Sequence, residues 1–314
     1  MRLILITLGL ILAVAGPSGA AETQIAILTA TPSGAWYPLG TTLSSIYTKA
    51  IPGANVTVQA THGSVENLRL LEAGDGELGF TLGSSLALAW AGDKEAGFNA
   101  PLRKLRVIAR IYPNFLEIGA SEKSGIKTLA DLKGKRASIG PKGSGTAVDA
   151  IAIFKAAGFT PDDLANFAPG PWAPSFGRVE KGELDAAMIE GGLDMELVRH
   201  LLASGQAQLV PIPPEIVAKV GSQGYVAGVI PARTFDGQPN DVPTTAVMNF
   251  LVTREGVSDD AVYLMTKSLF DHLDQLIQTN PVAKDIDVKK AATDLPIPLH
   301  PGAERYYREI GVIK

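Results

Sequence analysis

Four short segments combine glycine with hydroxyl side chains, each after an expected strand and before an expected helix. Free N–H groups and positive dipole character at a helix N-terminus favour anions, and glycine lets a ligand approach the backbone. Ser and Thr hydroxyls add hydrogen-bond donors. One such segment is more often a simple helix cap, but four in one chain favour a binding cleft for a small carboxylate. The segments are residues 31–36 (TPSGAW), 61–64 (THGS), 83–85 (GSS) and 140–146 (GPKGSGT).

The sequence lacks the motifs of nucleotide-binding, hydrolytic and metal sites. The phosphate-binding pattern G-x-x-x-x-G-K-[ST] fails because Thr146 directly follows Gly145, without the lysine. No serine lies in a G-x-S-x-G motif, no H-E-x-x-H occurs, and the chain has no cysteine. The four histidines, at positions 62, 200, 272 and 300, do not have metal-ligand spacing. We therefore expect no catalytic residue, no metal and no cofactor, and hence not an enzyme.

Further side chains are candidates at the same site. Trp36 opens an expected helix, where its ring could stack on a ligand, and Trp172 in the Pro-rich stretch 169–174 could line the opposite wall. His62 could donate to a ligand or make a hydrogen bond within its own loop. Glu190 ends an expected strand, where its carboxylate would either receive an ammonium group or be solvated. None of the four segments contains arginine, so a carboxylate would be held by helix N-termini and hydroxyls.

Short apolar strands alternate with amphipathic helices, which indicates an α/β fold with parallel strands. The carboxyl ends of such strands share one edge, where the four segments would meet. A second unit is expected after a Pro-marked junction at 110–113, and a turn at 236–241 indicates a long hairpin. Ser64 is expected to cap a helix that Gly74 ends. The helix after residue 145 is expected to bury Val148, Ile151 and Ala152. The expected strands include 24–29, 55–60, 77–82, 115–120 and 137–140.

The start of the chain predicts export. Arg2 precedes an apolar run at 3–15, and small residues at 18–20 resemble a signal-peptidase site. We expect residues 1–20 to be a cleaved signal peptide and the mature protein to be periplasmic. The 314 residues carry 28 Lys and Arg against 32 Asp and Glu, a net charge of −4. This balance argues against nucleic acid as a partner, and the length suggests two domains at about 150 residues each.

Nearly the whole mature chain resembles the TAXI family, the extracytoplasmic solute receptors of TRAP transporters. The resemblance implies a type II periplasmic-binding-protein fold: two α/β lobes joined by hinge strands, with a ligand cleft between them. It also implies that a small carboxylate or an amino acid such as glutamate is delivered to integral membrane subunits of a TRAP transporter. The motifs are GAWYPLG (34–40), GSVENLRLLEAGDGELGF (63–80), LADLKGKRASIGPKGSGT (129–146), GELDAAMIEGG (182–192) and LHPGAERYYREIGV (299–312).

The resemblance also implies ligand-binding residues, to which the strand and loop analysis adds Ser84 and Glu190. Two segments of the site, 29–33 and 83–85, depart from the family pattern, so the ligand need not be the usual amino acid. The implied residues are Ser33, Gly34, Ala35, Trp36, Thr61, His62, Gly63, Ser64, Asn67, Gly143, Ser144, Gly145, Thr146, Gly191 and Gly192.

The sequence therefore predicts a periplasmic solute receptor for an amino acid, a dicarboxylate or a keto acid. Lobe one is expected to comprise 22–112 and 243–314, and lobe two 113–242, with the second crossover between 212 and 243. Two alternatives remain at this point: a sensor subunit that presents its ligand to a signalling protein, and a small-molecule enzyme on the same fold.

Overall fold

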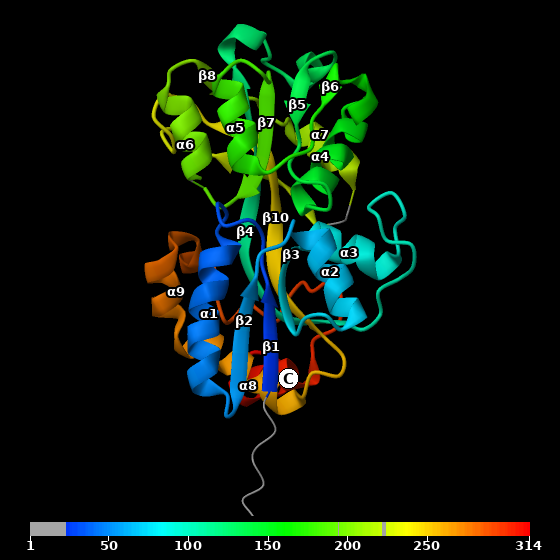
Figure 1. Cartoon of the computed structure of the whole chain (residues 1–314), viewed down its shortest axis with the longest axis vertical. Coiled ribbons are helices and arrows are strands. Elements are labelled where there is room, and N and C mark those ends of the chain that lie inside the picture. Colours follow the sequence, from blue (N-terminus) through cyan, green and yellow to red (C-terminus); the bar gives the residue numbers. More distant parts are fainter. Residues whose placement is uncertain (1–22, 194, 222–223) are drawn as a thin grey trace, which may run out of the picture.

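The computed structural model describes residues 23–193, 195–221 and 224–314, so the expected signal peptide lies outside the described residues. Figure 1 shows two α/β lobes, one above the other, connected by two long strands, β4 (Leu105–Ser121) and β10 (Val242–Arg254). All strands belong to one sheet, with the order β2-β1-β3-β10-β4-β7-β5-β6, and β8 and β9 pair at its side with β4 and β10. The predicted two-lobe α/β fold is confirmed.

The lower lobe contains the N-terminal half-sheet and the C-terminal helices (Figure 1). Strand β1 pairs in parallel with β2 and β3, and β10 runs antiparallel to both β3 and β4. The elements here are β1 (Thr23–Leu28), α1 (Trp36–Ala50), β2 (Ala54–Gln59), α2 (Ser64–Ala73), β3 (Leu78–Leu82), α3 (Gly83–Ala91), α8 (Asp259–Asp271), α9 (Leu273–Thr279), the 3₁₀ helix η4 (Pro281–Asp285) and α10 (Pro301–Glu309).

The upper lobe is built from the middle of the chain. Strand β5 pairs in parallel with β6 and β7, while β7 runs antiparallel to β4. The elements are η1 (Glu122–Ser124), η2 (Leu129–Leu132), β5 (Arg136–Ser138), α4 (Gly145–Ala156), η3 (Pro161–Asp163), β6 (Asn166–Phe167), α5 (Trp172–Glu180), β7 (Ala186–Gly191), α6 (Glu196–Ala203), β8 (Ala207–Leu209), α7 (Pro214–Val220) and β9 (Tyr225–Ile230).

Local sequence signals explain several of these elements. Helix α1 buries Leu39, Leu43 and Ile46, which recur every three or four residues and so share one face. Gly74 ends α2 with φ 94°, a left-handed conformation that glycine adopts at little cost, as predicted. The predicted hairpin is confirmed, because β9 and β10 pair antiparallel from Val242 opposite Ile230 onward.

Three local predictions are wrong. The expected strand 115–120 is only the second half of β4, which runs from Leu105 to Ser121. Next to Pro113, where an N–H is lacking, the β10 ladder shifts register. Ser64 does not cap α2: Gly63 is the N-cap, and the Ser64 hydroxyl instead accepts a hydrogen bond from the Leu82 N–H (3.1 Å). The third error concerns α4. Its buried face carries Gly145, Thr146, Asp149, Ala150, Ile153 and Phe154, whereas Val148, Ile151 and Ala152 are only partly buried.

Two kinds of feature are absent from the part of the chain that the structure describes. None of its helices has the length and apolar character needed to span a bilayer. None of its His, Asp and Glu side chains gather in groups of three or more that could hold a metal ion.

Candidate functional site

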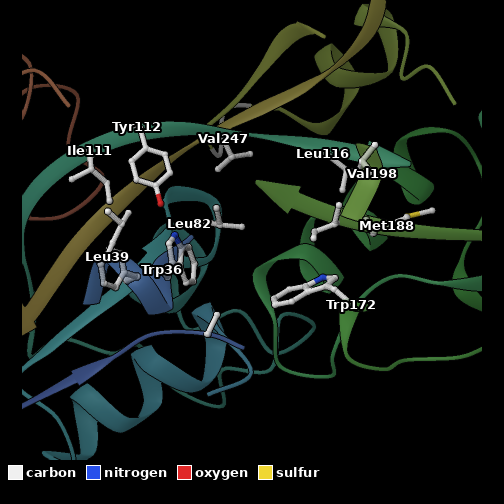
Figure 2. Close-up of a cluster of buried hydrophobic side chains, with 14 of the residues drawn as sticks. Trp36, Leu39, Leu82, Ile111, Tyr112, Leu116, Trp172, Met188, Val198 and Val247 are labelled. Carbon is white, nitrogen blue, oxygen red and sulfur yellow. The ribbon is translucent and has the colours of Figure 1, made fainter. Parts of the chain in front are cut away.

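A pocket lies between the lobes, and both contribute to its walls. Figure 2 shows Trp36, Leu82 and Tyr112 on the lower-lobe side and Trp172 on the upper-lobe side. Its cavity volume is small, about 30 Å³, and residues of both lobes approach one another closely around it. Its lining residues are Ala30, Gly34, Ala35, Trp36, Gly63, Ser64, Leu82, Tyr112, Asn114, Ser144, Gly145, Thr146, Trp172, Ile189, Glu190, Gly191 and Met195.

Direct contacts between the lobes hold this closed arrangement. The Val65 N–H of α2 donates to the Gly143 carbonyl of the upper lobe (3.2 Å). The Ser84 hydroxyl of α3 donates to Asp149 Oδ2 of α4 (3.0 Å). Lys155 of α4 pairs with Glu95 of the lower lobe at the surface. These three contacts join α2, α3 and the segment after α3 to the upper lobe.

The first segment supplies Gly34, Ala35 and Trp36 to the pocket. The Trp36 indole is buried, stacks on Phe80 with ring centroids 5.8 Å apart, and donates from Nε1 to Asn249 Oδ1 (3.1 Å). Ser33 does not line the pocket, because it is exposed with its hydroxyl 3.1 Å from that of Thr31. Trp36 is thus both a core residue and a wall of the site.

The second segment divides between the pocket and the scaffold. Gly63 and Ser64 line the pocket, and φ 107° at Gly63 is a conformation that favours glycine. His62 is exposed, and its Nδ1 lies 2.6 Å from Glu66 Oε2. Thr61 and Asn67 are buried below the pocket, where the Thr61 hydroxyl donates to Asn67 Oδ1 (2.7 Å).

Asn67 connects three strands of the lower lobe. Its Nδ2 donates to the carbonyl of Thr29 (2.7 Å), directly after β1, and to that of Phe80 (2.8 Å), in the middle of β3, while the Thr61 hydroxyl that it receives follows β2. The structure therefore places this expected ligand-binding residue in the support of the site loops.

Replacing Asn67 with alanine is expected to destabilise the protein more than to weaken solute affinity. The change removes three buried hydrogen bonds, two donated to the Thr29 and Phe80 carbonyls and one accepted from the Thr61 hydroxyl, at about 0.5–1.5 kcal/mol for each. Urea unfolding should report the loss in the free energy of unfolding. His62→Ala, on the exposed side of the same segment, is the control and should leave stability within about 0.5 kcal/mol. A stable Asn67→Ala protein that no longer binds solute would contradict the scaffold role.

The third segment of the lower lobe follows β3 directly. Ser84 does not line the pocket: it is fully buried in the first turn of α3, and its hydroxyl bonds to Asp149 across the lobe interface. The structure thus places this expected ligand-binding residue in the closing contacts.

In the upper lobe, the N-terminus of α4 supplies its N-cap Ser144 and its first two residues, Gly145 and Thr146. The Ser144 hydroxyl accepts from the Ala147 N–H (3.1 Å) and caps α4. Gly143 lies beside the pocket without lining it, and its carbonyl receives the Val65 N–H.

The end of β7 adds Glu190 and Gly191. Both carboxylate oxygens of Glu190 are buried and lack a hydrogen-bond partner among the residues described. Burial, and then the neighbouring Asp149 carboxyl, raise the pKa of Glu190. Gly192 does not line the pocket. It packs against the lower lobe so closely that a Cβ there would lie 2.2 Å from Val282 Cγ1.

Several lining residues carry no local sequence signal. Tyr112 and Asn114 flank Pro113 inside β4, and Met195 precedes α6, so only the tertiary fold brings them to the pocket. Trp172 is different, because its position in a Pro-rich stretch makes it a candidate from sequence alone. Two buried polar atoms, Trp172 Nε1 and Asn114 Oδ1, have no partner within the described chain. They are a donor and an acceptor available to a ligand.

Comparisons with known proteins agree with this architecture. The family model of the NMT1-like family matches residues 27–311. The fold is similar to that of PhnD1 from Prochlorococcus marinus in complex with methylphosphonate, with 13% identity, coverage of 93% of this chain and 99% of that one, and a TM-score of 0.57. It is also similar to the alkanesulfonate-binding protein SsuA from Xanthomonas axonopodis pv. citri bound to MOPS, with 17% identity, coverage of 92% and 85%, and a TM-score of 0.50.

A third solved structure, described as a periplasmic transporter, shares 13% identity, with 93% of each chain covered and a TM-score of 0.56. At these identities the likeness shows the fold alone, which is the two-lobe fold of periplasmic solute-binding proteins.

Proposed function

The chain belongs to the NMT1-like family, and from that premise we propose that it is a periplasmic receptor for a small carboxylate-bearing solute. The proposed ligand is an amino acid such as glutamate, a dicarboxylate or a keto acid. The receptor would hand this solute to the integral membrane subunits of a transporter. The resemblance to the TAXI receptors favours a TRAP transporter as that partner.

The convergence of four helix N-termini on the pocket is the observation that carries this proposal. Trp36, Ser64, Gly145 and Trp172 are the first residues of α1, α2, α4 and α5, and all four line the pocket. Each N-terminus presents unpaired N–H groups and positive dipole character, which stabilise an anion. None of the lining residues is Lys or Arg. A carboxylate would thus be held by backbone N–H groups, the Ser144 hydroxyl and the Trp172 indole.

The same premise supports a hinge between the lobes. Strand β10 pairs with β9 up to Val247 and with β3 from Asn249 onward, and β4 pairs with β7 from Phe115. We place lobe one at 22–112 and 243–314 and lobe two at 113–242. Rotation of the lobes would then twist β4 and β10 near these partner changes.

A thermal-shift screen of the mature protein tests the ligand class. Amino acids, dicarboxylates, keto acids, alkanesulfonates and phosphonates are compared, and a carboxylate at 100 times its Kd should add about 2.7 kcal/mol of stability. Hits confined to sugars or other uncharged solutes would refute the proposal. Hits confined to sulfonates or phosphonates would support the receptor function but contradict the proposed carboxylate ligand.

Ser144→Asp tests the anion site itself. Aspartate caps a helix as well as serine does, but it places a negative charge where the ligand's anion would lie. We expect affinity to fall at least tenfold, since like charges brought together cost several kcal/mol. Ser144→Asn is the matched control, because it is a good cap of the same size without the charge. Equal affinities of the two variants would contradict the anion site.

A further inference from the structure

Two buried carboxyl groups lie together at one side of the pocket. Asp149 of α4 is fully buried and Glu190 of β7 is 8% exposed. Asp149 Oδ1 accepts from the Tyr225 hydroxyl (2.7 Å) and Oδ2 from the Ser84 hydroxyl (3.0 Å). Glu190 lines the pocket with both oxygens unpartnered in the described chain. One carboxyl is thus held by the closing contacts, and the other faces the ligand space.

The surroundings of the pair provide no positive charge. Of the packed elements, α3 contributes Ser84, β9 contributes Tyr225, and β4 contributes Asn114, which are all neutral. The charged side chains of α7, Glu215 and Lys219, are exposed. Neither Asp149 nor Glu190 forms an ion pair with a Lys, Arg or His of residues 23–193, 195–221 and 224–314.

Two adjacent buried carboxylates cannot both stay ionised without a compensating cation. Burial raises the pKa of Asp149 to about 6, against the opposing effect of its hydrogen bonds from Tyr225 and Ser84. Burial also raises the pKa of Glu190, and the charge of Asp149 adds to the rise. When the lobes open, Ser84 leaves Asp149 and water reaches the pair, so both groups should return towards their ordinary pKa values. Closure therefore requires one positive charge at this position.

We propose that Asp149 and Glu190 form a subsite for the ammonium group of the ligand, and that a proton takes its place when the ligand has no ammonium. This inference rests on the proposed solute-binding function and narrows its ligands to those with a primary amine. An ammonium group has three N–H donors. Glu190 offers two free oxygens, and the unpartnered Asn114 Oδ1 is a third acceptor nearby, since Asn114 Nδ2 donates to the Glu190 carbonyl (3.4 Å).

The charge balance gives the pair a measurable signature. In the open protein at pH 7 both carboxyls are ionised, with their protons in solvent. Closing on an ammonium supplies the positive charge, so no proton needs to be taken up. Closing on an amine-free carboxylate moves one proton from solvent to the pair. Because the pKa values are higher in the closed form, the affinity for amine-free ligands is retained at low pH. It falls as the pH rises from the ordinary carboxyl pKa of the open form towards the raised pKa of the closed pair.

Isothermal titration calorimetry at pH 6 and at pH 8, each in two amine buffers that are effective at that pH and differ in ionisation enthalpy, measures the protons exchanged. The probes are L-glutamate with glutarate, and L-leucine with 4-methylpentanoate, so that each pair differs in the amino group. We expect the amino acid of at least one pair to bind at least tenfold more tightly at pH 8. It should bind with little proton uptake, whereas its amine-free counterpart should take up about one proton.

Glu190→Gln keeps the shape of the side chain and removes its charge. We expect it to lose the preference for the amine and most of the pH dependence of binding by the amine-free probe. Asp149→Asn should reduce the same preference and serves if Glu190→Gln fails to fold. Glu183→Gln, an exposed change in the same lobe, is the control and should leave binding unchanged.

The possible outcomes separate this inference from the proposed function. Equal binding of amino and amine-free probes without a difference in proton uptake would overturn the ammonium subsite, while the receptor would stand. Binding of amine-free probes only would do the same. Failure of every carboxylate, in this experiment and in the thermal-shift screen, would overturn the proposed function and the inference with it.

Discussion

Replacing Gly145 with alanine is expected to prevent lobe closure and to abolish solute binding while the protein remains folded. A Cβ at this position would lie 2.5 Å from Leu82 Cδ1 and 2.6 Å from Ser64 Oγ, both in the opposite lobe. The Ser64 hydroxyl is held by the Leu82 N–H, so it cannot move away freely. Alanine is a better helix former than glycine by about 1 kcal/mol, so α4 itself should not be weakened.

Solution scattering gives the direct measurement. The wild-type radius of gyration should decrease on addition of a ligand from the screen, whereas that of Gly145→Ala should stay at the open value. Gly177→Ala is the matched control, because Gly177 also lies in an upper-lobe helix and a Cβ there meets no atom within 4 Å. A Gly145→Ala protein that closes and binds normally would show that the lobes do not approach as closely as the structure indicates.

Replacing Trp36 with alanine should cause a large loss of stability. The change empties a buried space beside Phe80 and leaves Asn249 Oδ1 without its donor, and Trp-to-Ala changes in cores cost about 3–5 kcal/mol. Trp36→Phe keeps a ring against Phe80 and leaves only Asn249 Oδ1 without its donor, so we expect the free energy of unfolding to fall by about 1–3 kcal/mol. Guanidinium unfolding measures both. Tyr37→Ala, at the next and only half-buried position, should cost less than either change. Equal losses of stability in Trp36→Ala and Tyr37→Ala would contradict a special role of the buried Trp36 contacts.

The sequence predicts most of the elements, because their signals are local. The spacing of apolar residues in α1, the glycine that ends α2 and the turn between β9 and β10 each lie within a few residues of what they determine. The expected strand 115–120 covers only part of β4, because a proline normally interrupts a ladder, whereas here the ladder with β10 shifts register next to Pro113. The buried face of α4 differs from the expected one because apolar periodicity treats aspartate as exposed. Asp149 is fully buried, and its carboxylate accepts hydrogen bonds from Ser84 of α3 and Tyr225 of β9.

The candidate site, like the fold, could be predicted only where the signal is local. The rule that loops gather at the carboxyl edge of a parallel sheet leads to Gly34, Ser64 and Gly145. It does not separate residues that face the pocket from those that support it, such as Asn67, whose amide is used by backbone carbonyls. Tyr112 and Asn114 enter the pocket from a strand that looks like ordinary core, so no single segment of sequence could reveal them.

The position of β10 in the sheet has a consequence for biosynthesis. It lies between β3 and β4, yet it is the last of the described strands to be synthesised. Phe80 of β3 and Ala109 of β4 both pair with Leu251 of β10, so neither can form its ladder before β10 is present. Until then, two long strand edges carry unpaired N–H and C=O groups, which readily pair with other chains. A newly synthesised chain therefore passes through an aggregation-prone stage, and folding dominated by such distant pairings is slow. Chains truncated before residue 242 should accumulate as insoluble material, and a chaperone that covers strand edges would raise the yield of the full-length protein.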